Sequence, residues 1–136
     1  MRPAPPPTPL ANANSALRSA RTMRAEWSVG VAEGLLTSVD VIEHACTVEG
    51  RPLRRMKLRQ LLLSQPHWGQ ARTGEAMTRF ARFAGLAPSA DLDELTVGWL
   101  IDSRAGGRRI SAWLDAVEVR RDGPPWPGFP YLRKPA

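Results

Sequence analysis

The sequence predicts an all-α protein, a single compact helical domain of five to six helices. Hydrophobic residues recur at helical spacing between residues 15 and 121, and no alternating run is long enough to build a sheet. The length of 136 residues suits one domain with one hydrophobic core. Both ends of the chain are rich in proline, so we expect flexible arms to flank the domain.

The first two helices follow from an apolar stripe and a capping pattern. The first is expected over about residues 15–34, with Gly34 as its stop. Thr37 followed three residues later by Asp40 resembles a capping box, which predicts a short second helix. On that helix Cys46 is expected on the buried face and His44 on the polar face.

The remaining helices are placed by leucine spacing and by turn residues. A third helix is expected over about 53–64, ended by Pro66, and a fourth over about 70–84, ended by Gly85. On the fourth, Arg79 is expected to pair with Glu75 on the solvent side. A weaker piece follows Asp91, and a last helix starts after a glycine pair near residue 107.

The domain organisation follows from these boundaries. Residues 1–14 read as a disordered, Pro-rich arm, residues 15–121 as the helical domain, and residues 122–136 as a C-terminal tail. The tail contains Trp126, Phe129 and Tyr131, which are unusual in a purely solvating segment and predict a contact with the domain or with a protein partner.

Cysteine content and hydropathy favour a cytoplasmic protein. The single cysteine excludes an internal disulfide framework and a multi-cysteine zinc site. No apolar run approaches the ~20 residues needed to span a bilayer, and the first ten residues lack the apolar region of a signal peptide. We therefore expect no membrane association.

Positive charge is concentrated in the middle of the chain. The formal net charge is +6, and residues 51–82 hold eight Lys and Arg residues against the single acid Glu75, a local net charge of +7. A basic segment of this kind favours a polyanionic partner.

Two short glycine-containing turns deliver the chain into helix N-termini. One is Pro66-His67-Trp68-Gly69 and the other is Arg104-Ala105-Gly106-Gly107. A helix start exposes up to four unpaired amide donors and attracts phosphate, and a nearby Arg adds a charge-assisted hydrogen bond. Two such starts could grip successive phosphates along one groove.

The run Met56-Lys57-Leu58-Arg59-Gln60-Leu61-Leu62-Leu63, the turn through Arg72, and Met77 with Gly85-Leu86-Ala87-Pro88 resemble the actinobacterial type of integration host factor. The resemblance extends over residues 15–117. It implies a monomeric, nucleoid-associated protein with a helix-two-turn-helix unit that binds duplex DNA with little sequence preference and bends or constrains it. That family usually has Pro-Gly-Val-Gly at the turn, whereas this chain keeps only Pro66 and Gly69.

The predicted DNA contacts lie in the basic block and at the two helix starts. Trp68 either stacks on the DNA or covers the core. The predicted residues are Arg54, Arg55, Lys57, Arg59, His67, Trp68, Gly69, Gln70, Arg72, Thr73, Arg104, Gly106, Gly107, Arg108 and Arg109.

Other functions have less support. No catalytic residues, cofactor motif or metal site are predicted, since His44 and Cys46 alone make a weak ligand pair. An enzyme is therefore not expected. Two binding functions stay open: an adaptor that docks a protein through the aromatic tail, and an RNA-binding helical module.

Overall fold

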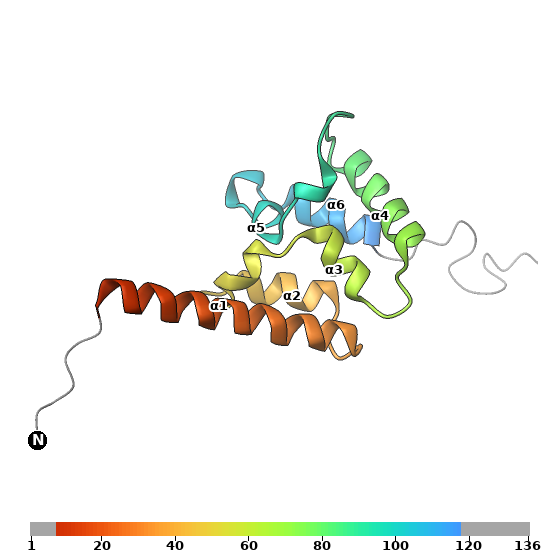
Figure 1. The fold of residues 1–136 in the computed structure, drawn as a ribbon. Helices are drawn as coiled ribbons and strands as arrows, with labels where there is room; N and C mark the ends of the chain where they lie inside the picture. The colour runs from red at the N-terminus through yellow and green to blue at the C-terminus, as the bar shows by residue number, and fades with distance from the viewer. Residues whose placement is uncertain (1–7, 118–136) are drawn as a thin grey trace, which may run out of the picture.

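Helices account for all the regular structure in residues 8–117, which are the residues that the computed structural model describes (Figure 1). No strand is present among them, so the predicted all-α single domain is confirmed. The α-helices are α1 (Pro9–Ala32), α2 (Ser38–Ala45), α3 (Leu58–Ser64), α4 (Gln70–Phe83), α5 (Val97–Leu100) and α6 (Arg108–Val117), and the short 3-10 helices are η1 (Arg51–Arg55), η2 (Leu92–Glu94) and η3 (Ser103–Ala105).

Helix α1 begins earlier than the expected residue 15, because Thr8 caps it. The Thr8 hydroxyl accepts a hydrogen bond from the Ala11 amide at 3.1 Å, and Pro9 occupies the first turn, where a missing N–H costs nothing. The expected arm is thus helical from Pro9 onward. At the other end Gly34 takes a left-handed φ of 77° and ends the helix as predicted.

The start of α2 follows the sequence prediction, but the position of Cys46 does not. Thr37 and Asp40 form the reciprocal capping box. Val41, Ile42 and Ala45 are buried, whereas Cys46 is exposed, because the helix ends at Ala45 and Cys46 is its C-cap. His44 is half-buried: it stacks on Trp27 at 4.4 Å between ring centroids and lines a surface depression with Asp40 and Glu43.

The expected third helix is two elements. Residues 51–55 form η1 and α3 starts only at Leu58, because the chain between them pairs with a distant segment. The Leu58 amide donates to the Leu95 carbonyl at 3.0 Å, and the Met56 carbonyl accepts from the Val97 amide at 2.9 Å. These hydrogen bonds form an isolated antiparallel bridge between Lys57 and Thr96, which consumes groups that a continuous helix needs.

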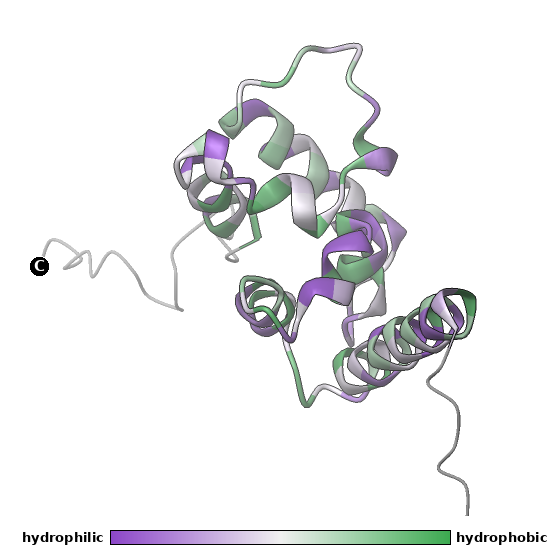
Figure 2. Ribbon diagram, turned by 90° about the vertical axis from the view of Figure 1, so that its left-hand side faces the viewer, coloured by the Kyte–Doolittle hydropathy of each residue, from purple (hydrophilic) through white to green (hydrophobic). Residues whose placement is uncertain are grey.

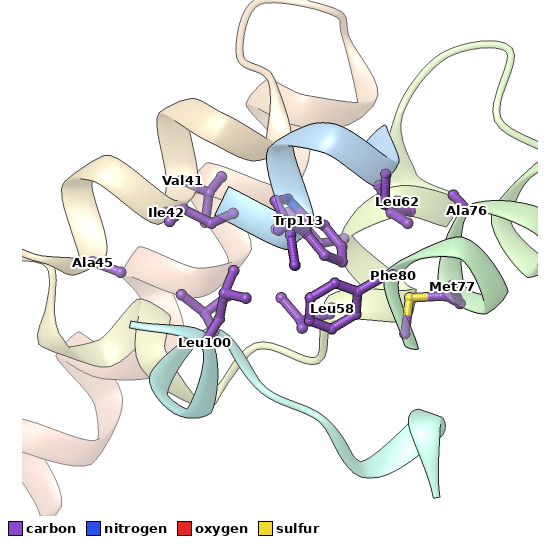
Figure 3. Packing of buried hydrophobic residues seen from close by; sticks show 14 of the residues in the cluster. Val41, Ile42, Ala45, Leu58, Leu62, Ala76, Met77, Phe80, Leu100 and Trp113 are labelled. Carbon is purple, nitrogen blue, oxygen red and sulfur yellow. The ribbon is translucent and has the colours of Figure 1, made fainter. Parts of the chain in front are cut away.

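A hydrophobic core joins all six α-helices. Trp113 of α6 and Phe80 of α4 are fully buried and meet edge to face, with ring centroids 5.3 Å apart. Leu58, Leu61 and Leu62 of α3 are also fully buried, as their spacing predicts. Figure 3 shows Trp113, Phe80 and Leu58 near the centre of this cluster.

Helices α4 and α6 pack on each other and run in opposite directions. Phe83, at the end of α4, lines surface depressions together with Gly107 and Arg108 at the start of α6. Arg79, one turn earlier on α4, contacts Ala116 near the end of α6. The two N-termini therefore lie at opposite ends of the helix pair.

Coloured by hydropathy, the helices carry hydrophilic as well as hydrophobic residues around their circumference (Figure 2). No helix within residues 8–117 combines the length and the hydrophobicity that crossing a bilayer requires.

Candidate nucleic-acid interface

The connection between α3 and α4 is a tight turn through Pro66 and His67. The Trp68 amide donates to the Gln65 carbonyl at 3.2 Å, and His67 holds a left-handed φ of 66°. Gly69 is the N-cap of α4, and no side chain caps this helix start. A Cβ added at Gly69 would meet nothing within 4 Å, so there is free space beside this helix start.

Two arginines frame this helix start. The Arg59 guanidinium donates from Nη2 to the Gln70 side-chain oxygen at 3.3 Å. The Arg72 guanidinium lies over the Trp68 ring, 4.0 Å from its centroid. Trp68 itself is partly buried and packs against the core. The structure thus brings six of the predicted residues together, which we call the α4 cradle: Arg59, His67, Trp68, Gly69, Gln70 and Arg72.

Acidic residues of η2 lie next to this cradle. Lys57 Nζ is 3.3 Å from a carboxylate oxygen of Glu94, and Arg59 Nε is 3.5 Å from one of Asp93. Both carboxylates are about two-thirds exposed, so these pairs are weak and open at little cost. Arg72 forms no ion pair with any described carboxylate.

Three predicted contacts are placed elsewhere. The Arg54 side chain is half-buried and donates from Nε to the Ala45 carbonyl at 2.8 Å, which closes the end of α2. Arg55 is exposed beside α1, away from the turn. Thr73 is fully buried, because it lies on the inner face of α4, and its hydroxyl has no hydrogen-bond partner among the described groups.

The start of α6 has the predicted glycine geometry, with left-handed φ values of 59° at Gly106 and 79° at Gly107. Its arginines, however, donate hydrogen bonds to backbone carbonyls of the protein itself. Arg108 Nε donates to the Ala105 carbonyl at 3.2 Å, and Arg109 Nη1 donates to the Trp99 carbonyl at 2.7 Å.

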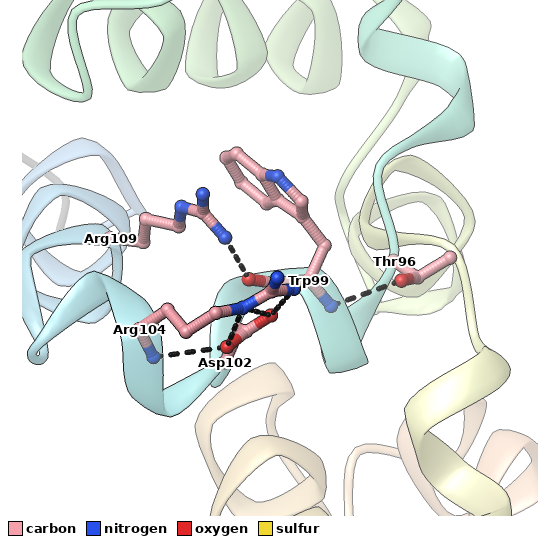
Figure 4. Close-up of polar contacts among 5 residues, drawn as sticks. All are labelled: Thr96, Trp99, Asp102, Arg104 and Arg109. Atoms are coloured by element: carbon pink, nitrogen blue, oxygen red, sulfur yellow. Dashed lines mark hydrogen bonds and ion pairs between the residues drawn. The ribbon is translucent and has the colours of Figure 1, made fainter.

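Arg104 and Asp102 form a bidentate ion pair, with Nη2 2.6 Å and Nε 3.1 Å from the two carboxylate oxygens (Figure 4). The side-chain hydrogen bond from Arg104, helped by the Arg104 amide, holds the pKa of the Asp102 carboxyl well below its usual range. The same contact raises the pKa of Arg104. Arg104 therefore offers less free charge to a ligand than its sequence position suggests.

Sequence patterns missed the aromatic partner of this second start. The Arg109 guanidinium lies 4.2 Å from the centroid of the Trp99 ring, and that ring meets Phe80 edge to face. Trp99, in the α-helix that precedes the glycine pair, is the sequence feature that could have predicted this contact.

The two helix starts do not form one groove. The fourteen residues of α4 span about 21 Å, and the starts of α4 and α6 lie at opposite ends of this length. Their amide dipoles point away from each other. Successive phosphates of one strand lie about 3.4 Å apart along the duplex axis, so the two starts are too far apart to hold neighbouring phosphates.

The described side chains do not gather into a metal-binding site. Within residues 8–117, no group of three or more His, Cys, Asp or Glu side chains could hold a metal ion. The aromatic tail and its predicted partner contact lie outside the described residues.

Comparisons with known proteins found no relative of this chain. No family model, no curated protein and no solved structure matches the chain. The similarity to the actinobacterial integration host factors stays a prediction from the residues quoted above.

Proposed function

We propose that the protein is nucleoid-associated and binds the phosphate backbone of duplex DNA through the α4 cradle. The observation that carries the proposal is the uncapped, open start of α4, flanked by Arg59 and Arg72. Amides, dipole and guanidinium groups all favour an anion at this point.

The contact follows from helix geometry. The amides of Gln70, Ala71 and Arg72 have no partner inside the helix, so they are free to donate to phosphate oxygens. Arg72 stacked on Trp68 is held close to these amides. Arg59 turns from Gln70 and Asp93 to the phosphate, exchanging exposed contacts for a charge-assisted hydrogen bond.

Phosphate contacts carry no base information, so we expect little sequence preference. The backbone of the turn agrees with the suggested family. The family turn has glycine at the position of His67, and the φ of 66° here is one that glycine adopts most readily.

The proposal assigns the backbone contact to α4 alone. For one duplex to contact the starts of both α4 and α6, it must curve strongly, because the α6 start faces the other way. Energy transfer between dyes at the two ends of a short duplex tests it: a shorter distance on saturation supports bending, and an unchanged distance removes it.

A salt titration with matched variants tests the proposed interface. We expect wild-type affinity for a short duplex to fall linearly with the logarithm of salt concentration. Arg72→Ala should weaken binding by about 1–3 kcal/mol and flatten the slope by about one unit. Arg82→Ala, an exposed site at the far end of the same helix, is the control and should change neither.

Equal slopes for wild type and Arg72→Ala would exclude Arg72 from the interface, and absence of binding at low salt would end the proposal. Competition with duplex RNA of equal length separates the two nucleic acids, because the cradle chemistry suits both. Preference for RNA would reassign the function to RNA binding.

A further inference from the structure

The N-terminal part of α1 extends beyond the rest of the protein (Figure 1). Every residue from 9 to 19, which we call the α1 overhang, is exposed. Leu10 is 70% exposed and Leu17 is 47% exposed, although both are large and apolar. Leu17 partly faces a depression that α1 shares with the η1 segment, whereas Leu10 lies near the start of the helix. Exposed apolar side chains of this kind gain from a partner surface.

The overhang carries one positive charge, Arg18, and no acid. Arg21 and Arg24 follow along α1, where Arg24 donates to the Pro52 carbonyl at 3.2 Å, and the helix contains no acid before Glu26. Beneath it, Arg24 and Leu17 line an open groove with Arg51 and Arg55 of the η1 segment. No carboxylate lines this groove.

A groove of opposite character runs along α2. It is a shallow, open depression, in which Trp27, Leu35 and Leu36 supply apolar lining and Asp40 and Glu43 supply acid, with His44 and Thr47 beside them. No Lys or Arg lines it. Residues 25–50 as a whole contain five acids and no Lys or Arg, so the surroundings are acidic as well. We call this feature the α2 groove.

The two surfaces are opposite in charge, with Arg18 on one and Asp40 and Glu43 on the other, and both expose apolar side chains. The eleven residues of the overhang measure about 16 Å, and the eight residues of α2 measure about 12 Å. The match cannot be satisfied within one chain, since Trp27 belongs to the same rigid helix as the overhang. Pairing of two overhangs with each other would bring like charges together.

We propose that the α1 overhang of one copy docks in the α2 groove of a second copy. The contact follows the helix-in-groove mode, with Leu10 and Leu17 as apolar anchors and Arg18 facing Glu43. Because the two surfaces differ, the contact is head-to-tail, and its repetition builds closed rings or open chains, depending on the rotation between copies. This departs from the monomer that the family resemblance implies, and it does not depend on DNA binding.

Two surface variants test the two sides of the proposed interface separately. The overhang variant is Leu10→Glu with Arg18→Glu, and the groove variant is Leu35→Arg with Glu43→Arg. All four sites are exposed, so the fold should tolerate the changes. Val29→Glu, at an exposed site on the opposite side of α1 from Trp27, is the matched control.

Light scattering on the full chain without nucleic acid measures the outcome. The average mass of the wild type and of Val29→Glu should rise above 15.0 kDa as concentration increases, and added salt should reduce the rise. Each double variant alone should stay at the monomer mass, with circular dichroism and thermal unfolding unchanged.

The decisive step is to mix the two variants. One retains a working groove and the other a working overhang, so the mixture should rise above the monomer mass although neither variant does so alone. A wild type that stays monomeric at millimolar concentration would overturn the proposal. Equally, variants that associate alone, or a mixture that stays monomeric while the wild type associates, would overturn it.

Discussion

Arg79 on α4 donates two hydrogen bonds to the backbone carbonyl of Ala116 on α6, from Nε at 3.2 Å and from Nη2 at 2.9 Å. The Ala116 carbonyl lies in the C-terminal part of the described α6, and carbonyl oxygens there carry partial negative charge. The half-buried Arg79 therefore links α4 to α6. This contact replaces the surface pair with Glu75 that the spacing predicts.

Arg79→Ala should lower the free energy of unfolding by about 1.5 kcal/mol, because a charged donor is lost from the end of α6. Urea denaturation followed by circular dichroism measures the change. Arg82→Ala serves as the control, since Arg82 is exposed on the same helix. Equal stability of the two variants would show that the contact with Ala116 contributes nothing.

Gly69→Asp should raise the stability of the fold and weaken DNA binding. The backbone at Gly69 is extended, with φ −88° and ψ −178°, and space around it is free, so an aspartate fits as N-cap. We expect a gain of a few tenths of a kcal/mol in stability. The carboxylate would occupy the proposed phosphate position and repel DNA.

Gly69→Ser is the matched control for this change, because it supplies a cap without charge. Its DNA affinity should fall less than that of the aspartate variant in the same salt titration. Undiminished binding by Gly69→Asp would mean that phosphate does not sit at the start of α4.

Gly50→Ala should be strongly destabilising. A Cβ at Gly50 would lie 1.8 Å from the His44 carbonyl oxygen, so the backbone of α2 must shift. We expect a loss of about 3 kcal/mol. Gly74→Ala, inside α4 with nothing within 4 Å, should instead gain about 0.5–1 kcal/mol. Thermal unfolding of both variants gives the comparison, and a tolerated Gly50→Ala would contradict the packing described.

The pair of Asp102 and Arg104 predicts a pH dependence of stability. The folded protein holds the pKa of Asp102 below its usual value, so the ionised carboxyl favours folding. This contribution is complete above about pH 4, the usual range of an aspartate, and is lost as the pH falls further toward the lowered pKa.

Asp102→Asn should therefore be less stable than wild type at neutral pH, with a difference that shrinks in acid. Arg104→Gln should show the same trend, because it removes the other partner. The effect is small, since the Arg104 side chain is exposed to solvent. Thermal denaturation from pH 7 down to pH 2 tests it, and a difference independent of pH would contradict it.

Local signals predicted the elements that depend on local contacts. The capping box of Thr37 and Asp40, the stops at Gly34 and Gly85, and the bounds of α4 are all as expected, because each rests on residues within one turn. The break between η1 and α3 was missed. It comes from hydrogen bonds to residues 95–97, and such pairing leaves no periodic trace in the sequence.

The candidate site was predicted in part for the same reason. The α4 cradle lies within a short stretch of chain, apart from Arg59 one helix earlier, so its grouping follows from the turn. Whether an arginine faces solvent depends on tertiary packing. Arg54 and Arg109 bind carbonyls of other elements, and the opposed directions of α4 and α6 separate the two glycine turns.

The exposed thiol of Cys46 has a practical consequence for all of these tests. It is the chain's single cysteine, and its neighbour Thr47 lines the α2 groove. A maleimide dye therefore attaches at one defined position in the unaltered protein. Its emission reports arrival of another molecule at that groove, while the cradle on α4 stays chemically untouched.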